Sequence, residues 1–307
     1  MLWLCAFFSV FAQDYQSFFS QLIADEKPTN ITRNSHYIVS NEAYQDIFQP
    51  FLAHKGGVLL GVGSEQLYTL AGWMKPDVLV PMDFDQYIVD LHRVYGLLFL
   101  HASNPESFLE LWNEANSTRV EQWILEEFQE HSEGMLKVFR FGRPHIENHL
   151  KKLQMRFEKR NISFFLNSQE QYEYCVSLHK EKRVFPVRGD LTKAQTIHSI
   201  SQAAQKANTP IQVVYLSNAE QYFPFDDVYR NNFLDAYWGA DAIILRTLPL
   251  GKDYRYYVQN AHNFQEYLRN SQYTSVREMV KERKVIPNTD ERGFLLPHSP
   301  KRKDSAK

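Results

Sequence analysis

The stretch GGVLLGVGSEQ, residues 56–66, gives the strongest indication of the fold. Its apolar run, residues 58–62, has the length and composition of a short buried strand. Gly61 and Gly63 permit a tight turn after that strand, and residues 67–73 are typical of the helix that follows. The order of strand, glycine turn and helix favours a parallel α/β sheet.

The alternation of strands and helices continues along the chain. Residues 78–82 form a second apolar run, and residues 87–100 have helical spacing. Further strands are predicted at residues 162–166, 184–188, 211–218 and 241–246. The pairs Ser168/Gln171 and Thr192/Gln195 have capping-box spacing, so each predicts the start of a helix, and a further helix is predicted at residues 226–238.

Residues 103–160 are predicted to form a helical insertion on the sheet. Pro105 begins one helix, residues 119–131 form another, and Pro144 suits the first turn of a third. No linker rich in Gly, Ser or Pro flanks this region. We therefore expect a single domain, residues 13–296, followed by a disordered basic tail, residues 297–307.

The N-terminus resembles a signal peptide. Residues 1–12 are apolar, and Val10 and Ala12 fit the small-residue rule for cleavage after Ala12. The prediction is an exported protein, periplasmic or secreted; a retained anchor or a buried N-terminus are the alternatives. Cleavage would leave Cys175 without an intramolecular disulfide partner.

Composition excludes several classes of protein. The 22 Phe, 17 Tyr and 5 Trp residues supply ample core material, which argues against disorder. Lys plus Arg is 34 and Asp plus Glu is 36, so the net charge of -2 gives no support to nucleic-acid binding. No internal apolar run approaches the roughly 18 residues of a membrane span, so none is expected in the mature chain.

Acidic side chains follow the predicted strands. Open α/β sheets bind ligands at the carboxyl ends of their strands, where a carboxylate can accept both hydroxyls of a ribose. Asp83 occupies the end of the second strand, so we assign it the ligand contact. Asp85, two residues later, is expected to cap the following helix. Asp190 follows the 184–188 run and could meet an adenine amino group or cap a helix.

The clearest strand, residues 211–218, ends in polar residues. Asn218 and Glu220 should stand on the carboxyl edge of the sheet, and Tyr222 could line the same crevice. A structural turn is the alternative interpretation. The predicted partner is a small-molecule ligand in that crevice.

No metal site is predicted. His145 and His149 have the four-residue spacing of two metal ligands on a helix, but the H-E-x-x-H pattern is absent. A solvated helix face is the favoured interpretation for this pair.

These motifs resemble two groups of proteins. Residues 57–66 and 214–222 (VYLSNAEQY) are similar to an uncharacterised bacterial family reading GVG-x-EQN and YLSN-x-EQY, over about residues 40–270. The motif order also resembles class I, Rossmann-like S-adenosylmethionine-dependent methyltransferases. That resemblance implies a Rossmann-like three-layer sandwich with a mostly parallel sheet. It also implies S-adenosylmethionine as cofactor, held by Gly61, Gly63, Glu65, Asp83, Asp190, Ser217 and Asn218.

The function expected from this resemblance is methyl transfer to an unknown acceptor. Tyr222, Glu220 or His92 could act as general base. The usual acidic or Asn-Pro-Pro-Tyr signature of the fourth strand is absent. Because adenosylmethionine is kept in the cytoplasm, export would favour the alternative, a non-enzymatic ligand- or partner-binding protein on a degenerate methyltransferase fold. A cytoplasmic location follows if residues 1–12 are not a signal.

Overall fold

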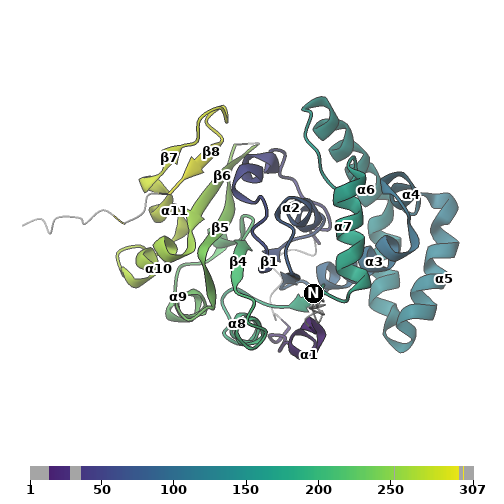
Figure 1. Ribbon diagram of the computed structural model, residues 1–307, viewed down its shortest axis with the longest axis horizontal. Coiled ribbons are helices and arrows are strands. Elements are labelled where there is room, and N and C mark those ends of the chain that lie inside the picture. The colour runs from purple at the N-terminus through teal and green to yellow at the C-terminus, as the bar shows by residue number, and fades with distance from the viewer. Residues whose placement is uncertain (1–13, 28–35, 252, 297–299, 301–307) are drawn as a thin grey trace, which may run out of the picture.

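An open, mixed sheet runs through the part of the chain that the computed structural model describes, residues 14–27, 36–251, 253–296 and 300. Among these residues eight strands pair in the order β3-β2-β1-β4-β5-β6-β8-β7 (Figure 1). They are β1 (Val58–Val62), β2 (Val78–Asp83), β3 (Val187–Arg188), β4 (Ile211–Tyr215), β5 (Trp238–Leu250), β6 (Asp253–Asn260), β7 (Lys284–Val285) and β8 (Gly293–Leu295). The predicted signal peptide lies outside the described residues, as does the predicted tail apart from Pro300.

The parallel part of the sheet confirms the main prediction from sequence. β3, β2, β1, β4 and β5 are all parallel neighbours, and β1 lies between β2 and β4. Chain order therefore reverses on either side of β1. β6 is antiparallel to β5, because a tight turn at Gly251, with φ of +62°, returns the chain directly from Leu250 to Asp253. This hairpin is not predicted from the sequence.

Side-chain alternation along the strands gives the sheet a core on each face. Leu59 and Leu79 contribute to one core, whereas Val58, Leu60 and Val80 contribute to the other. Burying each such side chain stabilises the fold by about 1.5–3 kcal/mol. The two cores require helices on both faces, so the sheet is the middle layer of three.

The helices divide between these two faces. One core is completed by α1 (Tyr15–Phe19), α8 (Gln195–Lys206), α9 (Asp227–Leu234), α10 (Ala261–Arg269) and α11 (Val276–Met279). The other is completed by α2 (Gln66–Met74), α3 (Gln86–His101), α4 (Pro105–Glu110), α5 (Ser117–Phe128), α6 (Ser132–Lys159) and α7 (Gln169–Lys180). Short 3-10 helices are η1 (Gln45–Phe51), η2 (Glu114–Asn116), η3 (Gln129–His131), η4 (Ala219–Tyr222) and η5 (Val280–Glu282).

The region predicted as a helical insertion forms a group of helices on the α3 side of the sheet (Figure 1). Its third helix does not begin at Pro144, as predicted. Instead α6 runs without interruption from Ser132 to Lys159, with Pro144 inside it. An internal proline costs roughly 3 kcal/mol, but Met135, Val138 and other apolar residues on both sides of it are buried on one face. Their burial offsets that cost.

Two other local predictions were wrong. Residues 162–166 form no strand; Phe164 and Phe165 are buried in a turn, where Asn167 accepts a hydrogen bond from the Phe164 N–H. A short apolar run does not distinguish a strand from a buried turn. Thr192 does not cap α8, which begins at Gln195; the distant Asp25 accepts hydrogen bonds from the Gln195 and Thr196 N–H groups instead.

Candidate functional site

Polar residues from separate parts of the chain meet at the carboxyl edge of the parallel strands. In the register of the sheet Val62 lies opposite Met82, and Gly61 lies opposite Tyr215. The residues that follow, Gly63, Asp83 and Leu216, therefore continue along one edge. The structure thus brings together the predicted ligand residues after β1, β2 and β4. Ligands of open α/β sheets bind where strand order reverses in this way.

A segment of the chain that precedes β1 runs across this edge. We call residues 36–44 the crossing segment. The His36 Nδ1 contacts the Asp85 carboxylate at 2.6 Å beside the end of β2, and the Ser40 N–H donates to Glu65 after β1. The Tyr44 N–H donates to the hydroxyl of Tyr256 in β6 at 2.8 Å. The crossing segment therefore spans the edge from β2 to β6.

The glycine turn after β1 is shaped by the helix that follows it. Gly63 has φ of +109°, a conformation that favours glycine. A Cβ at Gly63 would overlap the Gln66 amide, and a Cβ at Gly61 would overlap the Leu67 side chain. Both glycines thus allow α2 to pack closely on β1. The turn therefore needs the space that a Cβ would occupy, as predicted, but side chains of α2 fill that space.

His92 contacts the glycine turn from the core of the protein. It lies in α3, is 1% exposed, and its Nε2–H donates to the Gly63 carbonyl at 2.8 Å. Its Nδ1 faces the Tyr68 hydroxyl at 3.2 Å. Burial lowers the pKa of His92 to about 4, so the ring is neutral near pH 7. The basic nitrogen of His92 points into the core, away from the edge of the sheet.

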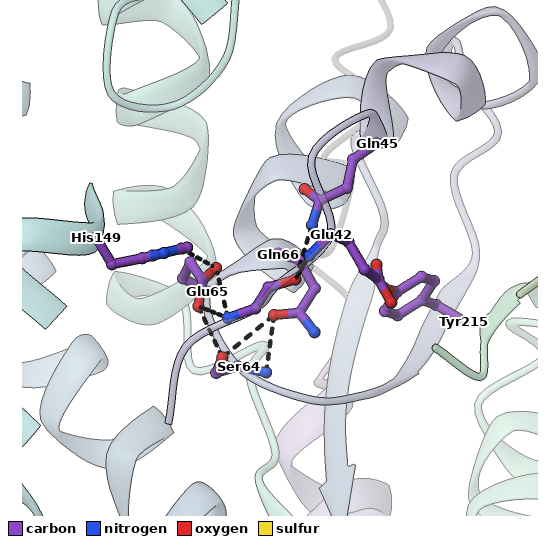
Figure 2. A network of polar contacts seen from close by, with 8 residues as sticks. Glu42, Gln45, Ser64, Glu65, Gln66, His149 and Tyr215 are labelled. Atoms are coloured by element: carbon purple, nitrogen blue, oxygen red, sulfur yellow. Dashed lines mark hydrogen bonds and ion pairs between the residues drawn. The ribbon is translucent and has the colours of Figure 1, made fainter. Parts of the chain in front are cut away.

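Glu65 is fully buried and forms an ion pair. Its carboxylate accepts hydrogen bonds from the His149 Nε2–H at 2.6 Å and the Ser64 hydroxyl at 2.7 Å (Figure 2). It also accepts from the Ser40 N–H at 3.1 Å. Burial alone would raise the pKa of Glu65, but His149 and Ser64 outweigh burial and lower it. Glu65 therefore joins the glycine turn, α6 and the crossing segment.

Glu42, in the crossing segment, also lies at this edge, and no sequence pattern identifies it as a site residue. It is 2% exposed and accepts hydrogen bonds from the Ser217 and Thr247 hydroxyls, both at 2.7 Å, and from the Tyr215 hydroxyl. Ser217 has φ of +49°, a backbone conformation that costs a non-glycine residue about 1 kcal/mol. Burial is the main cause that raises the pKa of Glu42.

Asp85 has the capping role that its position predicts, and Asp83 lies at the end of β2 as predicted. Asp85 caps α3, since its carboxylate accepts a hydrogen bond from the Tyr87 N–H at 3.0 Å. Asp83 ends β2, is 8% exposed and accepts from the Asp85 N–H at 2.9 Å. Burial, with a smaller contribution from Asp85, raises the pKa of Asp83 to about 7. Among the described residues no cation forms an ion pair with Asp83.

Of the four other predicted site residues, Asp190 and Glu220 have partners elsewhere. Asp190 accepts hydrogen bonds from the N–H and hydroxyl of Thr192, both at 2.8 Å, within its own turn. Glu220 is buried and lies 2.6 Å from Arg246 in an ion pair on the α9 side of the sheet. Tyr222 is 72% exposed. Asn218 is half-buried beside Ser217.

The described ranges contain no group of three His, Cys, Asp or Glu side chains that could hold a metal ion. No helix in these ranges is both long enough and apolar enough to cross a bilayer. Two surface hollows are lined by described residues, one on α6 and one between α1, α3 and β3. Neither is lined by Gly63, Asp83 or Glu42.

The sheet and its edge define a mixed α/β protein with buried acidic groups at its strand ends. The chain belongs to the family described as Domain of unknown function (DUF7790), whose model matches residues 37–295. This match extends from the crossing segment to the last strand of the sheet. No curated protein matches the chain at a significant level.

Proposed function

We propose that the protein is an S-adenosylmethionine-binding, methyltransferase-like protein with a Rossmann-like fold, acting on an unknown acceptor. The observation that carries the proposal is Asp83. Its buried carboxyl group ends the strand next to the glycine turn and has no cation partner among the described residues. Two ribose hydroxyls are suitable partners for such a group, because each donates a hydrogen bond that favours the carboxylate.

In this proposal an adenosyl ligand would lie on the β1 and β2 side of the edge. Asp83 would hold the ribose, and the backbone of residues 63–65 would face the amino-acid end of the ligand. Ser217 and Asn218 would border the same ligand from β4. When bound, S-adenosylmethionine supplies an electrophilic methyl group on a positively charged sulfur. The protein would contribute mainly by holding the acceptor in line with that methyl group.

The three general-base candidates differ in what they can reach. The basic nitrogen of His92 faces Tyr68 in the core, and Glu220 is engaged by Arg246 and by the Tyr229 hydroxyl at 2.6 Å. Tyr222 is largely exposed. It is therefore the candidate that an acceptor could meet without rearrangement of a buried pair, and we keep it as the proposed base.

A second candidate function is a non-enzymatic binding protein, exported if residues 1–12 act as a signal. The crossing segment favours this alternative, because its contacts with Asp85, Glu65 and Tyr256 cover the edge where a cofactor would bind. An adenosyl ligand on the β1 and β2 side would need residues 36–40 of this segment to move, whereas Glu42 would stay in place. Binding of adenosylhomocysteine, which S-adenosylmethionine becomes after methyl transfer, therefore distinguishes the two candidate functions.

Thermal melting with and without adenosylhomocysteine tests the proposal. The wild type should melt at a higher temperature with the ligand, because a ligand that binds the native state stabilises it. Asp83→Ala should lose this shift, whereas Asp85→Ala should melt earlier but keep it. A wild type without any shift would reject the adenosyl site, and a loss confined to Asp85→Ala would reverse the assignment.

A further inference from the structure

The crossing segment supplies one buried carboxyl group, that of Glu42, which has no positively charged partner among the described residues. Glu42 is bound by three hydroxyl groups, from Tyr215, Ser217 and Thr247. No Lys, Arg or His of the described ranges forms an ion pair with it. Three neutral donors satisfy the hydrogen bonds of a carboxylate but leave its negative charge uncompensated.

Two other buried glutamates differ from Glu42 in this respect, whereas Asp83 shares its lack of a cation partner among the described residues. Glu65 pairs with His149 at 2.6 Å, and Glu220 pairs with Arg246 at 2.6 Å. Burial separates Glu42 from water just as it separates these two residues. The charged group that most affects Glu42 is another carboxylate, Glu65, which further raises the pKa of Glu42. This part of the edge therefore favours the arrival of a positive charge.

Three tyrosine residues lie near the same carboxylate. Glu42 contributes to the raised pKa of Tyr254 and Tyr256, after burial in each case, so both phenols lie within electrostatic range of it. Tyr215 contacts it directly. A carboxylate among tyrosine rings suits an organic ammonium ion, which is attracted both by the charge and by the faces of aromatic rings.

We propose that Glu42 recognises the ammonium group of the ligand that binds at this edge. The inference rests on the proposed function, and it names the α-ammonium of the adenosyl amino acid as the group that Glu42 binds. Ser217 joins the two parts of the site: its hydroxyl holds Glu42, and its backbone follows β4 at the edge where Gly63 and Asp83 also lie. Asp83 would thus select the ribose and Glu42 the amino-acid end.

Calorimetric titration with two ligands tests this role. One ligand is adenosylhomocysteine, and the other is its desamino analogue, in which hydrogen replaces the α-ammonium. The wild type should bind adenosylhomocysteine at least about tenfold more tightly than the analogue. Glu42→Gln, which keeps the shape but removes the charge, should reduce this preference to less than about threefold. Such differences correspond to the loss of one charged interaction.

Thr247→Val is the matched control, because it removes one donor to Glu42 and leaves the carboxylate in place. It should keep the preference for the ammonium-bearing ligand. Equal affinity of the wild type for both ligands would overturn the role of Glu42 even if Glu42→Gln fails to fold. An unchanged preference in a folded Glu42→Gln variant would overturn it too, while leaving the adenosyl site intact. Failure of the wild type to bind either ligand would reject the proposed function itself.

Discussion

The Glu65 carboxylate and the His149 imidazole form an ion pair, with 2.6 Å between Oε1 and Nε2, that joins the turn after β1 to the middle of α6. The two residues are 84 positions apart in the chain. Glu65 is fully buried and the His149 side chain is 17% exposed. The pair therefore fixes a helix of the predicted insertion against the proposed ligand edge, and it also determines how the fold should respond to pH.

Replacing His149 should destabilise the fold strongly near neutral pH. His149→Gln leaves the Glu65 carboxylate buried without a charge partner, and breaking a buried pair typically costs about 3–5 kcal/mol. Urea denaturation of the wild type and the variant measures this difference. His145→Gln, on the exposed face of the same helix, is the control and should change stability by less than about 0.5 kcal/mol.

The effect of His149→Gln should depend on pH in a defined direction. Burial lowers the pKa of His149, but Glu65 outweighs burial and raises it above the usual value. A histidine with a raised pKa stabilises the fold fully below pH 6.5 and ceases to do so as the pH rises through its folded-state pKa. The difference in unfolding free energy between wild type and variant should therefore shrink in alkaline solution. A constant difference from pH 6 to pH 9 would contradict the ion pair.

His92 should affect stability in acid. Its pKa is lowered chiefly by burial to about 4, so protonation favours the unfolded state below pH 6.5. Lowering the pH from about 6.5 to 4 should remove up to about 3 kcal/mol of stability through this residue.

Asp83 opposes this effect in the same pH range, because its raised pKa favours the folded state at low pH. The wild type alone therefore does not isolate the contribution of His92. The difference between wild type and His92→Gln does, and we expect it to vary between pH 4 and 6.5. Parallel stability curves for the two proteins would disprove the neutral, buried state of His92.

Alanine substitutions at Gly63 and Gly251 distinguish the cost of steric overlap from the cost of a positive φ. Both have positive φ, but a Cβ at Gly63 would overlap Gln66, whereas a Cβ at Gly251 has no neighbour within 4 Å. Gly251→Ala should cost about 1 kcal/mol through the backbone alone. Gly63→Ala should cost at least about 1 kcal/mol more. Thermal melting of both variants provides the comparison, and equal losses would show that Gln66 moves aside without cost.

Ligand binding at Asp83 should strengthen as the pH rises. With a pKa of about 7, the carboxyl group is mostly protonated at pH 6, whereas ribose hydroxyls would bind its charged form. The affinity for adenosylhomocysteine should increase about tenfold from pH 6 to pH 8. Asp83→Asn should bind more weakly and lack this dependence. Affinity that falls over the same range would assign the contact to another group.

Sequence patterns predicted the central part of the sheet because local signals agreed there. The apolar run before Gly61 and the acids after Met82 indicated β1, β2 and the cap at Asp85 without any long-range information. Glu42 carried no such signal: an acid in a polar segment resembles any solvated loop residue. Its burial depends on hydroxyl groups of Ser217 and Thr247, which are far away in sequence.

The helical spacing of His149 predicted a solvated position, which is wrong for the same reason. Spacing along a helix does not reveal that a buried glutamate from another element faces it. The continuity of α6 across Pro144 likewise depends on tertiary burial, which outweighs the local preference of proline for a first turn. Long-range contacts, rather than local propensity, determined each of these differences.

The central claim is that the carboxyl edge of β1, β2 and β4 binds an adenosyl ligand. Isothermal titration of the wild type with adenosylhomocysteine at pH 8, where the Asp83 carboxylate is charged, tests it most directly. We expect saturable binding of one ligand per chain, greatly weakened in Asp83→Ala. The absence of any binding heat for the wild type, together with an unchanged melting temperature, would contradict it.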